Sequence, residues 1–233
     1  MFDTNRYRDS LEELRNELPT TVTWTACSAG RSLGAIRTEL PPAWPYMSYR
    51  GTHRVADGGE PPHVGERTTD FSGWNGIPAF RPLILSTSGR CSDPDQWKPR
   101  ALPPHLAMAL RERIRESALA MRSCEKDGHA VPCDLAHRDW RVGEVLASRN
   151  GEWLVHAKGA DPREAALSAL FHVSRSGLVR AVGLDMRVVD AGDWDADGQS
   201  EVLAKFERYN HDGYTLLYGE DLALSATFGW IYH

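Results

Sequence analysis

Acidic side chains recur at every second position in one short run near the carboxyl end of this chain of 233 residues. Counting from residue 193, aspartate fills the first, third and fifth places, glycine the sixth and glutamate the ninth. Calcium is a hard cation that takes about six to eight oxygen ligands, and alternate side chains of a tightly curved loop can converge on one point. The glycine permits the sharp bend that such a loop needs. The run therefore predicts a Ca²⁺ site whose ligands are Asp193, Asp195, Asp197, the backbone carbonyl of Gln199, and Glu201.

The spacing differs from that of an EF-hand, because the twelfth place holds Ala204 instead of a bidentate glutamate. The alternative to a metal site is an acidic turn in contact with water. Three aspartates so close together repel one another unless a cation lies between them, so we expect calcium. A structural role, in which the ion stabilises the sheet, is favoured over contact of the metal with a ligand or substrate.

The elements that position this run are predicted to be strands of an antiparallel sheet. Leu184 to Val189 leads into the run and Glu201 to Tyr209 leaves it, and Asp212-Gly213 is expected to turn the chain into the next strand. Two hairpins are expected upstream, because Asn-Gly and Ser-Gly pairs at residues 150–151 and 176–177 separate apolar runs. Successive hairpins build a meander, which predicts a C-terminal half that resembles a propeller blade.

The rest of the chain predicts an α+β, β-rich fold. Apolar residues at helical spacing indicate a helix over Asn5 to Leu18 and one long helix near 104–123. Strands are expected over Thr21 to Thr25, Ser32 to Thr38 and Arg81 to Ser86. We expect residues 1–100 to form a helix and a loop-rich β region, and residues 101–233 to form the long helix and the antiparallel sheet with its calcium loop. The two parts can equally form one continuous domain.

A long loop rich in glycine and proline precedes these strands. It contains Phe71 and Trp74, three residues apart. Loops of this length in compact domains are usually functional or disordered, so the two rings are candidate anchors for a protein partner. The alternative, which is favoured, is that they fold over the sheet as part of its core.

Four cysteines leave the cellular compartment open. Cys124 and Cys133 bracket a polar segment that a disulfide can close, but four cysteines allow three pairings and the sequence does not choose among them. A zinc cluster is not expected without CxxC spacing. The protein is expected in the periplasm or outside the cell if a signal peptide has been removed, and in the cytoplasm otherwise.

Charge and hydropathy narrow the range of partners. The net charge of −5 gives no reason to expect nucleic acid, because duplex binding usually needs a basic face. No apolar run is long enough to span a membrane. A glycine-rich phosphate loop and HExxH are absent from the sequence. His137-Arg138-Asp139 is similar to a kinase catalytic loop, but residue 144 is glutamate where that motif has asparagine.

The run from Val189 to Glu201 reads VDAGDWDADGQSE and resembles a VDAGDYDGDGRSE stretch of an uncharacterised family of bacterial proteins. Its spacing is also similar to the DxDxDG loops of FG-GAP repeats and related β-propeller blades. Other parts of the chain resemble motifs of the same bacterial family, namely Arg81-Pro82-Leu83, the DPDQWKP run over residues 93–99, the YNHDGY run over residues 209–214, and the final Tyr232-His233. The resemblance implies one calcium loop on a β-rich scaffold and supplies no activity. Gln96 and Ala196 depart from the family pattern, and neither is a proposed ligand.

Three classes of function remain. A non-enzymatic, calcium-stabilised binding protein that acts on a protein partner, as an inhibitor or an immunity-type protein, is favoured. The first alternative is a hydrolase whose catalytic carboxylates the sequence does not pair, and the second is a carbohydrate-binding or structural module of the cell envelope. Two facing carboxylates in a pocket would favour the hydrolase.

Overall fold

The computed structural model describes residues 18–40, 54–56, 59–72, 76–121, 123–126, 129–132, 140–159, 168–208 and 211–231. The helix expected over residues 5–18 lies outside these residues except for its last position, and Trp74, Cys133 and Tyr232-His233 lie outside them too. None of the described helices is long and apolar enough to cross a membrane.

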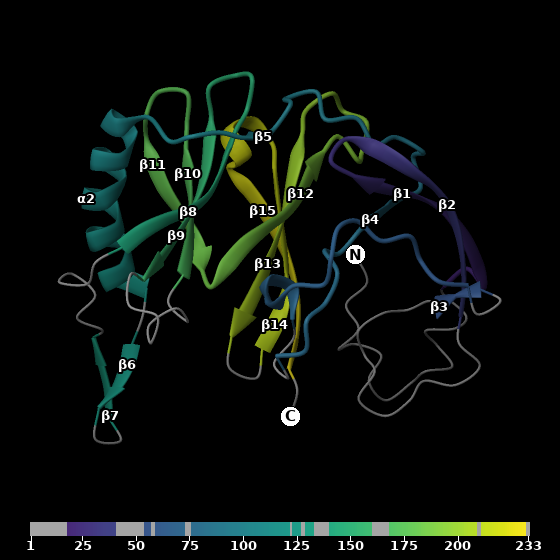
Figure 1. Ribbon diagram of the computed structural model, residues 1–233, viewed down its shortest axis with the longest axis horizontal. Helices are drawn as coiled ribbons and strands as arrows, with labels where there is room; N and C mark the ends of the chain where they lie inside the picture. The colour runs from purple at the N-terminus through teal and green to yellow at the C-terminus, as the bar shows by residue number, and fades with distance from the viewer. Residues whose placement is uncertain are drawn as a thin grey trace.

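Three antiparallel sheets lie side by side (Figure 1). The N-terminal sheet has the strand order β3-β2-β1-β4, the middle sheet β11-β10-β9-β8-β5, and the C-terminal sheet β12-β13-β14-β15. Their strands are β1 (Thr21–Ser28), β2 (Arg31–Glu39), β3 (Arg54–Val55), β4 (Ile84–Ser86), β5 (Lys98–Pro99), β8 (Trp140–Ala147), β9 (Trp153–Gly159), β10 (Ser168–Val173), β11 (Val179–Leu184), β12 (Met186–Gly192), β13 (Glu201–Arg208), β14 (His211–Tyr218) and β15 (Leu224–Ile231).

The remaining elements are one long helix and several short pieces. They are α2 (Pro104–Met121), the hairpin of β6 (Ser123–Lys126) and β7 (His129–Pro132), and the 3₁₀ turns η3 (Thr69–Phe71) and η5 (Glu220–Leu222). The predicted β-rich class with antiparallel sheets and one long helix is therefore confirmed for the described residues.

The middle sheet is buried on both faces. On β9 and β10, Leu154 and Leu170 pack into a core shared with the C-terminal sheet, whereas Val155 and Phe171 pack into a second core with Leu110 of α2. Successive side chains of a strand point to opposite faces, so neighbouring residues serve different cores. Figure 1 shows α2 covering the outer face of the middle sheet, and the order of layers is helix, sheet, sheet.

The C-terminal sheet is a meander in which each strand pairs with the next along the chain. The turn expected at Asp212-Gly213 is wrong, because both residues lie inside β14 and pair with Trp230 and Gly229 of β15. Gly213 forms no turn, and its lack of a side chain is needed for close packing. A Cβ at this position would lie 2.4 Å from Phe206 and 2.3 Å from the carbonyl oxygen of Phe228, so only glycine fits there.

Candidate metal centre

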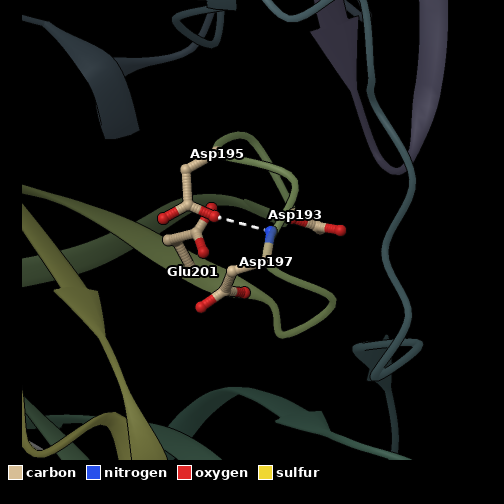
Figure 2. A group of neighbouring side chains, drawn as sticks. All are labelled: Asp193, Asp195, Asp197 and Glu201. Atoms are coloured by element: carbon tan, nitrogen blue, oxygen red, sulfur yellow. Dashed lines mark hydrogen bonds between the residues drawn. The ribbon is translucent and has the colours of Figure 1, made fainter.

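The acidic run forms the loop that joins β12 to β13. Asp193, Asp195, Asp197 and Glu201 each place one carboxylate oxygen so that all of these oxygens lie within 4.8 Å of one another. Figure 2 shows the four side chains gathered around one point inside the curve of the loop. The four predicted carboxylate ligands are therefore brought together, and the cluster can hold a metal ion.

Backbone N–H groups of the loop hold these carboxylates in place. Asp195 accepts a hydrogen bond from the N–H of Asp197 at 3.0 Å (dashed in Figure 2), and Asp197 accepts one from the N–H of Gln199 at 2.8 Å. Glu201 reaches back from β13 and accepts from the N–H of Trp194 at 2.7 Å. The carbonyl of Gln199 remains a predicted ligand.

The tight curve requires two residues in the left-handed region. Gly198 has φ +90° and Ala196 has φ +70°. Glycine adopts this conformation freely, whereas a residue with a Cβ pays about 1–2 kcal/mol. Ala196 therefore carries a steric cost that Gly198 does not.

Two of the four carboxylates are buried. Asp193 and Glu201 are each 5% exposed, while Asp195 and Asp197 are open to solvent. The Oδ1 atom of Asp193 is buried without a hydrogen-bond partner. Burial raises the pKa of Glu201 to about 7, helped by the charges of the three aspartates and opposed by the N–H of Trp194. A buried carboxylate surrounded by like charges needs a proton or a cation.

Residues 86–97, which we call the bracing segment, hold the start of the loop. The hydroxyls of Ser86 and Ser88 donate to the carbonyl of Trp194 at 3.3 and 3.1 Å. The N–H of Asp193 donates to the carbonyl of Ser92 at 2.7 Å. The two backbones can approach this closely because residue 192 is glycine. A Cβ at that position would lie 3.2 Å from the carbonyl oxygen of Ser92.

The same segment also holds the end of the loop. The Ser200 hydroxyl donates to Asp93 at 2.7 Å, and the Ser200 N–H donates to Asp95 at 3.0 Å. Asp93 in turn accepts from the N–H of Trp97 at 2.7 Å. Burial raises the pKa of Asp93, although these hydrogen bonds act in the opposite direction. The two motifs DPDQWKP and VDAGDWDADGQSE, about a hundred residues apart in sequence, are thus in contact.

Contacts from Asp95 extend to the middle sheet. The carbonyl of Asp95 accepts from the N–H of Arg149 at 2.7 Å, and its carboxylate accepts from the side-chain amide of Asn150. Arg149 and Asn150 form the turn between β8 and β9. The bracing segment therefore connects the acidic loop to the middle sheet.

Three contacts join the same region to the N-terminal sheet. A disulfide links Cys27 of β1 to Cys91 of the bracing segment. The N–H of Ala29 donates to both carboxylate oxygens of Asp190 on β12, at 3.1 and 3.0 Å. Arg81 donates to the carbonyl of Val189 at 2.9 Å. The acidic loop therefore lies where all three sheets are connected.

The disulfide differs from the pair that the sequence singled out. Cys27 and Cys91 are 64 residues apart, and no local pattern connects them. The candidate pair Cys124–Cys133 is not described, because Cys133 lies outside the described residues, and it stays a prediction.

Phe71 is buried, as the favoured alternative expected. The ring is 7% exposed and lies under the guanidinium of Arg81, at 5.2 Å from its centre. Asp70 forms an ion pair with Arg187, and Lys205 donates to the carbonyl of Ser72, so η3 is fixed to the outer face of the C-terminal sheet. A buried ring offers little surface to a partner, and the anchor role stays a prediction for Trp74.

Sequence reasoning did not find a buried acid–base pair beside the β8–β9 turn of the middle sheet. Glu152 and His172 are 4% and 2% exposed, and the nearest nitrogen and oxygen are 3.4 Å apart. The pKa of Glu152 is lowered, first by His172 and further by the charge of Arg175. Because both side chains are closed to solvent, this pair holds β9 and β10 together instead of meeting a substrate.

The chain matches no model of a protein family, no curated protein and no solved structure. The resemblance of its motifs to a bacterial family therefore stays a prediction.

Proposed function

We propose that this chain is a non-enzymatic, calcium-stabilised binding protein that presents its loops to a protein partner, as an inhibitor or an immunity-type protein. The observation that carries the calcium part is the acidic loop, where two buried and two exposed carboxylates place oxygens within 4.8 Å of one another. All four side chains of the cluster are acidic, so none of them neutralises the others and a cation can bind among them.

The ligand set favours calcium over other metals. All four ligands are carboxylate oxygens, which suit hard cations, whereas zinc and copper sites draw on histidine and cysteine. Calcium accepts irregular coordination by six to eight oxygens, while magnesium demands near-octahedral geometry. The open side of the loop, at Asp195 and Asp197, leaves room for water to complete the shell.

An ion here would stabilise the junction of the sheets. Asp193 and Glu201 lie at the two ends of the loop, and each neighbours a residue that the bracing segment holds. Neutralising their repulsion removes the force that would open the loop. Calcium that binds the folded state alone stabilises it by about 2.7 kcal/mol at a hundred times its dissociation constant.

Thermal unfolding tests the calcium part. The protein is melted with calcium and with a chelator, beside the variants Asp195→Ala and Glu60→Gln. Glu60 is an exposed carboxylate that is not part of the acidic cluster, so its variant should keep the calcium-dependent rise in melting temperature, and Asp195→Ala should lose it. Equal melting temperatures of the native protein with and without calcium would refute the calcium site.

The partner surface is best placed on the exposed parts of residues 59–72 and 76–80. Thr68 and Ala79 are bridged, and the ring of His63 stacks on Phe80 with 4.2 Å between ring centres. These two stretches, which we call the strip, expose the aliphatic side chains of Val64, at 39%, and Ile77, at 60%. Binding residues lie disproportionately on loops that a rigid scaffold positions.

Affinity capture from the native bacterium tests the partner part. The double variant Val64→Asp/Ile77→Asp should lose a captured protein without a change in melting temperature. Leu178→Asp is the matched control, because Leu178 is also 60% exposed but lies at a hairpin tip of the middle sheet. If the double variant and Leu178→Asp capture the same amount of partner, the partner surface does not lie on this strip.

The disulfide supports a location in the periplasm or outside the cell. Disulfides form and persist in oxidising compartments, and Cys27–Cys91 joins two segments that surround the proposed calcium site. The proposal predicts that protein purified from its native host carries this pair oxidised, as intact mass after alkylation without reductant would measure. Alkylation of both cysteines would place the protein in the cytoplasm.

A further inference from the structure

We propose that calcium binding at residues 193–201 and the Cys27–Cys91 disulfide are thermodynamically coupled, so that reduction of the disulfide weakens calcium binding. The inference rests on the proposed calcium site. Its physical basis is the bracing segment, which carries Cys91 and touches both ends of the acidic loop.

The first step is the position of Cys91 in that segment. Its neighbour Ser92 accepts the N–H of the first ligand, Asp193, at 2.7 Å. Ser88, three residues before Cys91, donates to the carbonyl of Trp194 at 3.1 Å. A bond that fixes Cys91 therefore fixes the backbone on both sides of Asp193.

The second step is the position of Cys27 on β1. Two residues later, the N–H of Ala29 donates to both oxygens of Asp190, a residue of β12 just before the loop. Asp190 is buried. The disulfide therefore joins two backbone segments that each hold the same strand end, one through Asp190 and the other through Asp193.

The third step is the far end of the loop. Asp93, two residues after Cys91, accepts from the Ser200 hydroxyl at 2.7 Å, and Ser200 precedes the last ligand, Glu201. Asp193 itself has a buried carboxylate oxygen without a hydrogen-bond partner. The ligands Asp193 and Glu201 thus keep their spacing only while the bracing segment stays in place.

The coupling follows from chain entropy. Cys27 and Cys91 close a loop of 64 residues, and breaking that closure lets the bracing segment sample positions away from β12. A loop that must be ordered again before it binds calcium has a lower apparent affinity. Coupling between sites in proteins is commonly about 5–150-fold, and we expect at least a fivefold loss.

Titration calorimetry with calcium alone is the direct test. The oxidised protein is compared with Cys27→Ser/Cys91→Ser, and Cys124→Ser/Cys133→Ser is the matched control that removes the other two sulfurs. The proposal expects the first variant to bind at least fivefold more weakly and the control to match the native protein. Affinities of the native protein and the first variant within fivefold would overturn the coupling, whereas failure of the oxidised protein itself to bind calcium would overturn the proposed function.

A second measurement does not need the cysteine variant to fold. In reduction by dithiothreitol, the reagent closes to its cyclic disulfide, and its two electrons and two protons convert the Cys27–Cys91 bond into two thiols. Because coupling is reciprocal, calcium should lower the equilibrium ratio of reduced to oxidised pair by the same factor, which alkylation and peptide mass measure. The ratio should not respond to calcium in Asp195→Ala. A native ratio that is equal with calcium and with chelator would overturn the proposal.

Discussion

Glu201 and Glu152 are both glutamates that lie almost fully out of water, and their surroundings are opposite. Glu152 has His172 at 3.4 Å and Arg175 at 3.7 Å, and its pKa is lowered. Glu201 has three aspartates beside it, and its pKa is raised to about 7. The first carboxylate is neutralised by groups of the protein itself, while the second requires a cation or a proton from outside. A buried carboxylate is thus part of an ion pair in one place and of a candidate metal site in the other.

The largest expected effect comes from breaking the internally neutralised pair. Glu152→Ala leaves His172 buried without its partner, and removal of one member of a buried pair costs about 3–5 kcal/mol. The loss in free energy of unfolding, measured by denaturant titration, should be the same with calcium and with chelator. A loss that appears only with calcium would mean that this pair belongs to the metal site.

Glu201 is tested most sharply by a variant whose effect on stability changes sign between chelator and calcium. Glu201→Gln keeps an oxygen for the N–H of Trp194 and removes one charge. At pH 8 with chelator, the native carboxylate is ionised above its raised pKa of about 7, which opposes folding, so the variant should be more stable by roughly 1–3 kcal/mol. With calcium at a hundred times the native dissociation constant, the variant should lose most of the roughly 2.7 kcal/mol that binding adds. Destabilisation in both conditions would contradict the comparison.

His156 offers a third kind of buried group, a base whose charged neighbours are mainly cations. Burial, the main cause, and the charges of Arg187 and Lys158 lower its pKa to about 4, while Asp70 acts in the opposite direction. Between pH 6.5 and pH 4 the unfolded chain takes up a proton that the folded protein does not. Stability therefore falls as the pH falls, by about 1 kcal/mol between pH 6.5 and pH 5.5. His156→Gln should flatten this part of the pH profile in chemical unfolding, and an unchanged slope would contradict it.

The sequence could predict the features that are determined by residues close together along the chain. The four carboxylates converge as expected, because their spacing and the glycine at 198 act within nine residues. The hairpins at Asn150-Gly151 and Ser176-Gly177 are likewise local, and both glycines adopt positive φ.

The contacts that the sequence could not predict join residues far apart. Nothing near Ser200 indicates that Asp93 and Asp95 will hold it across more than a hundred residues. No pattern pairs Cys27 with Cys91. Gly213 was misread because glycine serves a turn and a crowded strand equally well, and only the positions of Phe206 and Phe228 distinguish the two.

The smallest expected effect concerns the backbone of the loop itself. Ala196 has φ +70°, where glycine carries no steric cost, although glycine also loses more entropy on folding. The difference should leave Ala196→Gly more stable by roughly 0.5 kcal/mol, and the gain should persist with chelator because the strain belongs to the backbone and not to the ion. Ala35→Gly is the matched control, since Ala35 is an exposed residue of β2 outside the residues with positive φ. There the same change should destabilise by roughly 0.5–1 kcal/mol. Equal losses in both variants, measured by denaturant titration, would mean that Ala196 is not strained and that the curve of the loop is set by its carboxylates alone.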